Sequence, residues 1–124
     1  RRQRQMCIRD RTDTTVSMTA ILELRGTDTN KAALLIAKLV ANQRKTQNAT
    51  IYEYYKDGLN YYLYERYAHS DDWAAHFEDF GNFADEFLSV FNLVQPKGFG
   101  PVSDNLKNAL LPMGFQFYDT IGSI

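Results

Sequence analysis

The sequence predicts an α+β domain in which helices cover one face of an antiparallel sheet, and three observations carry this prediction. Residues 50–80 read as a strand, a tight turn, a second strand and a capped helix. Residues 16–25 alternate between apolar and polar side chains, as a strand buried on one side does. Further segments show the apolar spacing of helices. With 124 residues, the chain is long enough for one domain with a core of its own.

The hairpin is centred on Asp57-Gly58, which lies between two β-prone runs. This dipeptide favours a type I′ turn, because both central residues of that turn need a positive φ. The turn is either Asp57-Gly58 alone or residues 57–60, and both choices give the same two faces. One face carries Tyr52, Tyr54, Leu63, Glu65 and Tyr67, and the other carries Ile51, Glu53, Tyr55, Tyr62, Tyr64 and Arg66. Neither face is plainly polar, so we expect both to be covered.

The first strand is expected to end at Gly26, where the alternation stops. Thr27 or Asp28 can then cap a helix by accepting from its free N–H groups. The apolar stripe of this helix runs to about Asn42.

A second helix is expected to follow the hairpin, with Ser70 as its cap and two aspartates in its first turn. Gly81-Asn82 interrupts its apolar stripe, which then continues to about Asn92. Residues 95–101 predict a turn-rich connector, with a short strand at residues 93–99.

The last part of the chain predicts one more helix and one more strand. Ser103 is expected to cap the helix, which Pro112 and Gly114 end. Residues 115–121 alternate enough for a last strand.

The order of these elements is β-α-β-β-α followed by β-α-β. The first six suit a ferredoxin-like α+β fold, an antiparallel sheet with helices on one face, and the last helix and strand are additions to it. In this fold the second face of the sheet is bare. The apolar patch on it would be too large for a monomer, so we expect a homodimer that buries Ile51, Tyr55, Tyr62 and Tyr64.

Composition and charge exclude several classes of partner. The net charge of −1 gives no electrostatic basis for binding nucleic acid or an anionic membrane. No apolar run approaches the length of about 18 residues that a membrane span needs. The single cysteine, Cys7, cannot form an intrachain disulfide, and no apolar segment follows the N-terminal arginines as in a signal peptide. We therefore expect a cytoplasmic protein.

Residues 1–11 stand apart, because they carry five arginines against one aspartate. They can be read as a basic arm for an anionic partner, as a disordered tail, or as translated non-native DNA, since residues 4–11 resemble such a peptide. We therefore place the domain at residues 12–124.

Four groups of residues resemble the antibiotic-biosynthesis-monooxygenase-like (ABM) domain, which belongs to the dimeric α+β barrel proteins. These groups are residues 52–57, residues 62–67, the helix at 71–77 and the pair Asn82-Phe83. The resemblance spans residues 16–91, and residues 99–124 resemble a C-terminal extension that some members carry. It implies a head-to-head dimer and a small aromatic or redox-active substrate. Members include cofactor-independent oxygenases of phenols and quinols, haem-degrading enzymes, an isomerase and proteins without known activity.

The resemblance also assigns individual residues. Glu65 matches the glutamate of the third strand, and His76 matches a recurrent histidine of the second helix. Asn82 stands where many members have a second histidine. Haem-degrading members use an axial histidine one turn further on, but residues 83–87 contain none, which argues against haem.

The residues themselves point to a proton-transfer pair. His76 lies on the apolar stripe of its helix, and imidazole titrates near neutrality. Glu65 lies on an aromatic face of the sheet, where a carboxylate is costly unless it is paired. We therefore expect Glu65 and His76 to form the catalytic acid/base element. The alternative is a core histidine that is hydrogen-bonded once and inert.

Aromatic side chains around this pair are candidates for binding the substrate. Tyr52, Tyr54, Tyr67 and Trp73 can stack on a flat ligand and donate hydrogen bonds to it, and the alternative is that they only pack. His69, Asp72 and His76 have a spacing that could suit a metal, but a first-turn aspartate usually serves the helix dipole, so we expect no metal.

These observations together predict a cofactor-independent monooxygenase of small phenolic or quinol-type substrates. His76, assisted by Glu65, would deprotonate the substrate, and the anion would pass an electron directly to oxygen. The alternative is a non-catalytic dimeric protein of the same fold that only binds a flat aromatic ligand; haem handling is disfavoured further by the missing histidine.

Overall fold

A computed structural model describes residues 13–124. The expectations about residues 1–11 therefore lie outside the described residues. The strands are β1 (Val16–Leu24), β2 (Ile51–Asp57), β3 (Asn60–Tyr67), β4 (Phe91–Phe99) and β5 (Gln116–Tyr118). The helices are α1 (Thr29–Thr46), α2 (Ser70–Phe80), α3 (Ala84–Val90) and α4 (Asp104–Leu110), followed by the short 3₁₀ helix η3 (Leu111–Met113).

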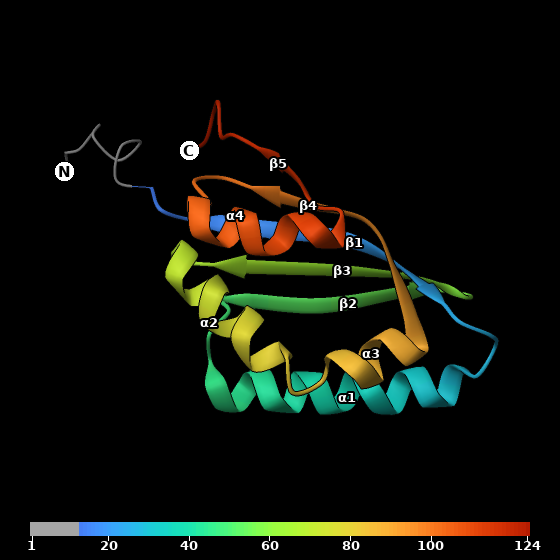
Figure 1. The fold of residues 1–124 in the computed structure, drawn as a ribbon. Coiled ribbons are helices and arrows are strands. Elements are labelled where there is room, and N and C mark those ends of the chain that lie inside the picture. Colours follow the sequence, from blue (N-terminus) through green and yellow to red (C-terminus); the bar gives the residue numbers. More distant parts are fainter. Residues whose placement is uncertain (1–12) are drawn as a thin grey trace.

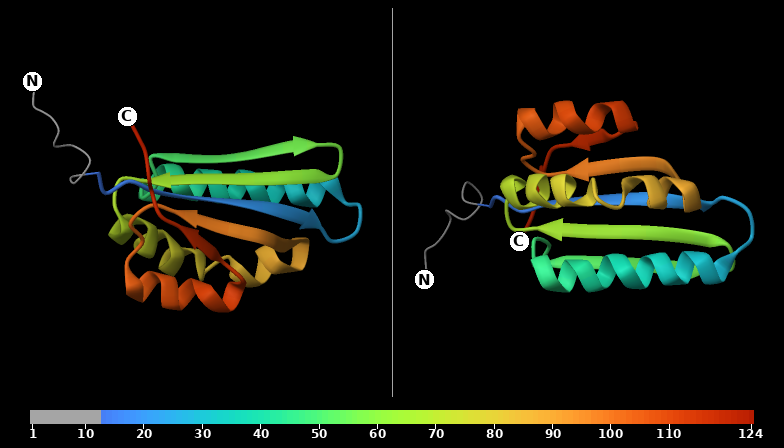
Figure 2. Two further views of the ribbon diagram at one scale, coloured as in Figure 1. Left: turned by 90° about the horizontal axis from the view of Figure 1, so that it is seen from above. Right: turned by 60° about the horizontal axis from the view of Figure 1, so that its bottom comes forward.

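The strands form one sheet in the order β2-β3-β1-β4-β5, and the helices lie side by side on one of its faces (Figures 1 and 2). The first four strands in this order pair antiparallel, and β5 pairs parallel with β4, so the complete sheet is mixed. The sheet of one chain stays open and does not close into a barrel. This arrangement confirms the predicted ferredoxin-like α+β fold with an added helix and strand.

Of the two predicted turns of the hairpin, the structure has the longer one, which spans residues 57–60. Asp57 pairs with Asn60, and Gly58, with a φ of 63°, is the first residue of the loop between them. Tyr52 pairs with Glu65 on the side of the helices. The predicted distribution of side chains over the two faces of the hairpin is therefore confirmed.

The cap of α2 differs by one residue from the prediction. The side chain of His69, not that of Ser70, accepts from the N–H of Asp71, at 3.0 Å. The Ser70 hydroxyl instead accepts from the main-chain N–H of Ser103, at 2.9 Å. Because Ser103 caps α4, as predicted, this bond ties the start of α2 to the start of α4.

The short strand predicted at residues 93–99 is confirmed as part of β4, which begins two residues earlier. The connector predicted at residues 95–101 is wrong over most of its length, because only residues 100 and 101 lie outside β4. This strand lies between β1 and β5, a central position in which proline is normally excluded. A bulge resolves the conflict: the register shifts between Thr19 and Ile21, so that Gln95-Pro96 face one residue of β1. Gln95 takes up the distortion with a φ of 49°.

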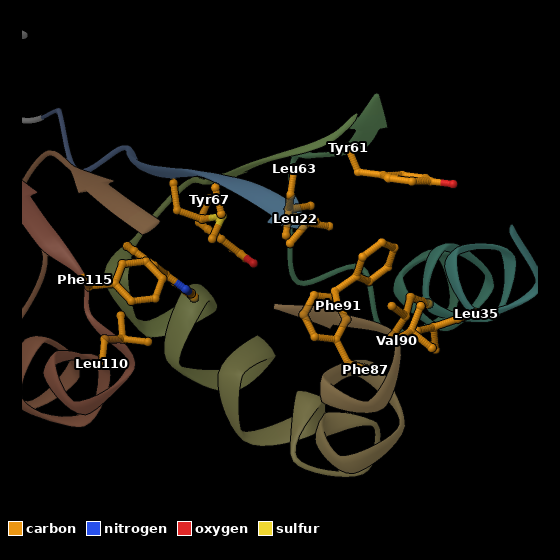
Figure 3. Close-up of a cluster of buried hydrophobic side chains, with 14 of the residues drawn as sticks. Leu22, Leu35, Tyr61, Leu63, Tyr67, Phe87, Val90, Phe91, Leu110 and Phe115 are labelled. Carbon is orange, nitrogen blue, oxygen red and sulfur yellow. The ribbon is translucent and has the colours of Figure 1, made fainter. Parts of the chain in front are cut away.

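The hydrophobic core fills the space between the sheet and the helices, as Figure 3 shows. Near α2 it is built from aromatic rings. Tyr67 stacks on Trp73 with an interplanar angle of 1° and 5.8 Å between centroids, and Phe115 meets Trp73 edge-on at 5.9 Å. The C-terminal segment therefore packs directly onto the sheet and α2.

The opposite face of the sheet carries exposed tyrosines. Tyr55 and Tyr62 pair across β2 and β3, and each is 52% exposed. Tyr118 on β5 is 44% exposed and stacks on Phe99 of β4.

The packing at the corner between β4 and α4 can be tested at Gly100, with Gly58 of the β2–β3 hairpin as a comparison, since both have a positive φ. At Gly100 a Cβ atom would lie 2.5 Å from the main-chain oxygen of Thr15, whereas a Cβ at Gly58 would meet open space. Gly58→Ala should therefore lower the free energy of unfolding by about 1 kcal/mol, from backbone strain alone. Gly100→Ala should cost roughly 3 kcal/mol, because the backbone must also shift. Urea unfolding of both variants measures this difference, and equal losses would contradict the packing described.

Candidate functional site

A cavity of about 370 Å³ lies between the sheet, helices α2 to α4 and the segment that follows α4. Most of its lining is aromatic or aliphatic. It is lined by Met18, Tyr54, Leu63, Glu65, Trp73, His76, Phe77, Phe80, Gly81, Ala84, Phe87, Leu88, Leu93, Leu110, Met113 and Phe115. The volume and the apolar walls are typical of a site for a small organic molecule.

Simple periodicity brings Glu65 and His76 to this cavity. Glu65 lies between Leu63 and Tyr67 on the helix-facing side of β3, and all three are buried. His76 lies one turn after Trp73 on the buried face of α2. The strand and the helix therefore present a carboxylate and an imidazole to the same layer.

The two groups form a buried pair. Nε2 of His76 lies 3.7 Å from Oε1 of Glu65, and the two residues are 7% and 5% exposed. The Tyr67 hydroxyl donates to the same Oε1 at 2.5 Å. Burial raises the pKa of the Glu65 carboxyl above its ordinary value of 4.5, although His76 and the Tyr67 bond act in the opposite direction. The predicted pair is thus in place, and its catalytic role stays a prediction.

A third buried polar residue, Gln43 of α1, contacts His76. Its amide oxygen accepts from the main-chain N–H groups of Asn48 and Ala49, both at 2.8 Å, and its amide nitrogen lies 2.9 Å from Nδ1 of His76. The amide orientation follows from chemistry, because a main-chain N–H can only donate. Gln43 was not among the residues predicted for the site, although a glutamine on the buried stripe of a helix is a signal that could have found it.

Two tyrosine hydroxyls lie next to this group. The hydroxyls of Tyr52 and Tyr54 are 2.7 Å apart, and the Tyr52 ring meets the His76 ring edge-on. Burial raises the pKa of both phenols, so both hydroxyls keep their protons. A pair of hydroxyls uses one proton between its oxygens and leaves the other to be donated elsewhere. Tyr54 lines the cavity and can present that donor to a ligand.

The other predicted binding residues divide into two groups. Trp73 lines the cavity, and Tyr67 lies behind it, in contact with Glu65 and Trp73. Asn82 is exposed in the turn between α2 and α3 and is not among the residues that line the cavity. The structure thus gathers four of the five predicted binding residues around the Glu65–His76 pair and leaves Asn82 outside.

The C-terminal segment supplies one wall of the cavity, although none of its residues was predicted to belong to the site. Leu110, Met113 and Phe115 line the cavity, and Figure 3 shows Leu110 and Phe115 among the clustered core side chains. The apolar stripe of α4 indicated burial, but nothing in the sequence indicated what it would cover.

Within residues 13–124, no cluster of three potential metal-ligating side chains is present. His69, one of the three residues weighed as a metal site, uses its Nδ1 to cap α2. Over the same residues, no helix combines the length and apolar character that crossing a membrane requires.

The fold and the cavity define a class: a ferredoxin-like α+β protein with an open sheet and an aromatic-lined cavity under its helices. No family model matches the sequence. No curated protein matches it either.

Solved structures do share the fold. MupZ from Pseudomonas fluorescens superimposes with a TM-score of 0.81 at 17% identity, over 89% of this chain and 93% of its own. A conserved protein of unknown function from Bacteroides thetaiotaomicron, described as a possible oxidoreductase, has a TM-score of 0.61 at 14% identity, over 70% and 97%. Rv0793 from Mycobacterium tuberculosis has a TM-score of 0.58 at 18% identity, over 73% and 97%. At these identities the likeness establishes a related α+β fold.

The share of this chain that each structure covers shows whether the C-terminal segment can have a counterpart there. The match to MupZ leaves 11% of the 124 residues, about 14, outside it. This is fewer than the 21 residues from Asp104 to Ile124, so at least part of that segment has a counterpart in MupZ. The other two proteins are almost fully covered and still match less than three quarters of this chain.

Replacing Glu65 tests its burial through the pH dependence of stability. Because the pKa of Glu65 is raised in the folded state, the folded protein binds this proton more tightly than the unfolded chain does. The free energy of unfolding should therefore fall as the pH rises from about 4.5 through the raised pKa, by about 1.4 kcal/mol per pKa unit. Glu65→Gln should remove this decrease and make the protein more stable than the wild type at neutral pH.

Urea unfolding across a pH series measures the effect. Glu78→Gln, at an exposed position of α2, is the matched control and should keep the wild-type pH dependence. A Glu65→Gln variant that is less stable than the wild type at neutral pH would show that the carboxylate is held mainly by its partners, not penalised by burial.

Proposed function

We propose that this protein is a small-molecule enzyme of the ABM-like group: a cofactor-independent monooxygenase of phenolic or quinol-type substrates. The observation that carries the proposal is the buried Glu65–His76 pair at the wall of an aromatic-lined cavity. Titratable groups with shifted pKa values inside a cavity are more frequent at active sites than elsewhere. The fold shared with a possible oxidoreductase is in keeping with this proposal.

The proposed chemistry begins with loss of a proton. The O–H bond of the substrate breaks, the proton moves to the Glu65–His76 pair, and the electron pair stays on the substrate oxygen. The resulting anion is electron-rich and can transfer an electron directly to molecular oxygen, which is the oxidant. The O–O bond breaks as one oxygen atom forms a C–O bond to a ring carbon, and the hydrogens lost from that carbon and from the hydroxyl leave with the other oxygen as water. A phenol thereby becomes a quinone, and the substrate itself supplies all the electrons, so no flavin or metal is needed.

The walls of the cavity support an aromatic substrate. Trp73, Phe80 and Phe115 offer ring faces and edges to a flat molecule. The hydroxyl of Tyr54 offers a hydrogen bond to a substrate oxygen next to the proton-transfer pair. An apolar interior also strengthens the interaction of each of these polar groups with a developing anion.

A non-catalytic ligand-binding protein is the second candidate. The observation that favours it is the lining itself, which is apolar over most of its surface and would hold a flat ligand without any proton transfer. Haem handling has less support, because His76 is engaged by Gln43 and residues 83–87 carry no histidine.

The exposed face of the sheet supports a homodimer. Ile51, Tyr55, Tyr62 and Tyr64 lie on this face, opposite to the cavity. A second copy of the chain would cover these side chains, and a specific dimer of this kind buries about 800 Å² per partner. We propose this dimer as the functional form, acting in the cytoplasm.

Ligand binding and turnover separate the two candidates. A phenol, naphthol or quinol that fits the cavity should raise the melting temperature, since a ligand at about 100 times its Kd adds about 2.7 kcal/mol. His76→Ala should reduce this shift. In an oxygen-consumption assay with the binding compound, Glu65→Gln should lower the rate at least about 100-fold. A raised melting temperature without oxygen consumption would favour the non-catalytic binding protein. Full turnover by Glu65→Gln would overturn the proposed chemistry.

The dimer is tested by a charge on the exposed face. Tyr62→Glu would place a carboxylate in the proposed interface, so the variant should elute as a monomer at concentrations where the wild type is a dimer. Light scattering after size exclusion measures both masses. Leu34→Glu, at a position of α1 that is 73% exposed, is the matched control and should stay dimeric. A wild type that is monomeric throughout would contradict the dimer.

A further inference from the structure

We infer that Gln43 sets the direction of proton transfer at the site, so that Glu65 takes the proton of the substrate and His76 acts as a hydrogen-bond donor. This inference rests on the proposed function for its substrate, but its structural part can be tested without one. It reverses the order expected from the sequence, in which His76 is the base.

Gln43 is fixed more firmly than its place near the end of α1 requires. It is 6% exposed, and its amide oxygen accepts from two consecutive main-chain N–H groups in the loop after the helix. The amide nitrogen therefore has one direction left, toward Nδ1 of His76 at 2.9 Å. A buried side chain with these three bonds has little freedom to turn.

The contact determines which nitrogen of His76 carries the proton. An amide nitrogen can only donate, so Nδ1 of His76 must accept and has no proton. In the neutral ring the proton is then on Nε2, the nitrogen that lies 3.7 Å from Glu65. The lone pair of the ring points at Gln43, which does not line the cavity.

A neutral His76 in this tautomer has no free lone pair for a ligand in the cavity. It can donate from Nε2, and it cannot accept there. Glu65 has the opposite character, because both groups that face its Oε1, the Tyr67 hydroxyl and Nε2 of His76, are donors. Its Oε2 has no hydrogen-bond partner among residues 13–124. Glu65 is therefore the group with acceptor capacity left for a ligand.

The proton-transfer step follows from this arrangement. The substrate O–H bond breaks, an O–H bond forms at Glu65, and the electron pair stays on the substrate oxygen. The N–H of His76 then faces a region in which negative charge has developed, and its distance to Glu65 can shorten in the complex. Burial, which raises the pKa of Glu65, makes this carboxylate a stronger base. Gln43 is a positioning residue in this scheme, since it acts through His76.

The competing explanation is that Gln43 only ties down the loop between α1 and β2. Gln43→Glu separates the two roles. A carboxylate keeps acceptor oxygens for the N–H groups of Asn48 and Ala49, but it cannot donate to His76. Nδ1 of His76 should therefore become protonated while the loop bonds persist.

Long-range ¹H–¹⁵N correlation spectra of the labelled protein report the protonation of each ring nitrogen. We would record them at about pH 8, above the usual titration range of imidazole. The chain has two histidines, and His69→Asn identifies the other set of signals because asparagine also caps helices. We expect an unprotonated Nδ1 and a protonated Nε2 at His76 in the wild type, and a protonated Nδ1 in Gln43→Glu. Gln47→Glu, which adds the same charge at an exposed position, should keep the wild-type pattern.

Turnover tests the second half of the inference. Glu65→Gln should lose at least about 100-fold in rate, whereas His76→Gln, which keeps a donor, should lose much less. A protonated Nδ1 in the wild type overturns the inference, whatever the enzyme turns over. A greater loss in His76→Gln than in Glu65→Gln also overturns it. The expected tautomer without turnover of any phenol would instead count against the proposed function and leave the tautomer assignment standing.

Discussion

The site depends on one constraint: a carboxylate buried among aromatic rings must be partnered. Glu65 is 5% exposed, and burying an ion of this kind without partners costs several kcal/mol. Three elements supply what it needs. β3 provides the Tyr67 hydroxyl, α2 provides His76, and α1 provides Gln43, which orients His76. The position of α1 and α2 over the sheet is therefore part of the chemistry of the site as well as of the core.

The C-terminal segment completes the cavity that this carboxylate lines. Without Met113 and Phe115, the pocket beside Trp73 would lose one wall. The hydrogen bond between Ser70 and Ser103 couples the start of α4 to the start of α2, so that this wall is held in register with His76.

Local patterns were enough to predict the sheet, the face of each hairpin residue and the meeting of Glu65 with His76. Alternation in β3 determines that Glu65 faces the helices, and helical spacing in α2 determines that His76 faces the sheet. Because both side chains point into the layer between sheet and helices, they can meet there. The misses have a common cause. The strand at residues 93–99 was predicted, but its bulge was not, because the bulge is defined by the pairing with β1. Gln43 was overlooked because its partners lie in the following loop and on another helix. Such features depend on tertiary contacts that no local pattern carries.

The register of the β2–β3 hairpin connects the two faces of the molecule. Along β3, Tyr62 and Tyr64 point to the open face, while Leu63 and Glu65 point to the cavity. A shift of this strand by one residue would exchange the two sets, placing a tyrosine where the carboxylate belongs and a charge in the proposed dimer interface. The Asp57–Asn60 pair and the positive φ of Gly58 exclude that shift locally. A two-residue loop thus determines which side chains of the hairpin face the cavity and which face the open side of the sheet.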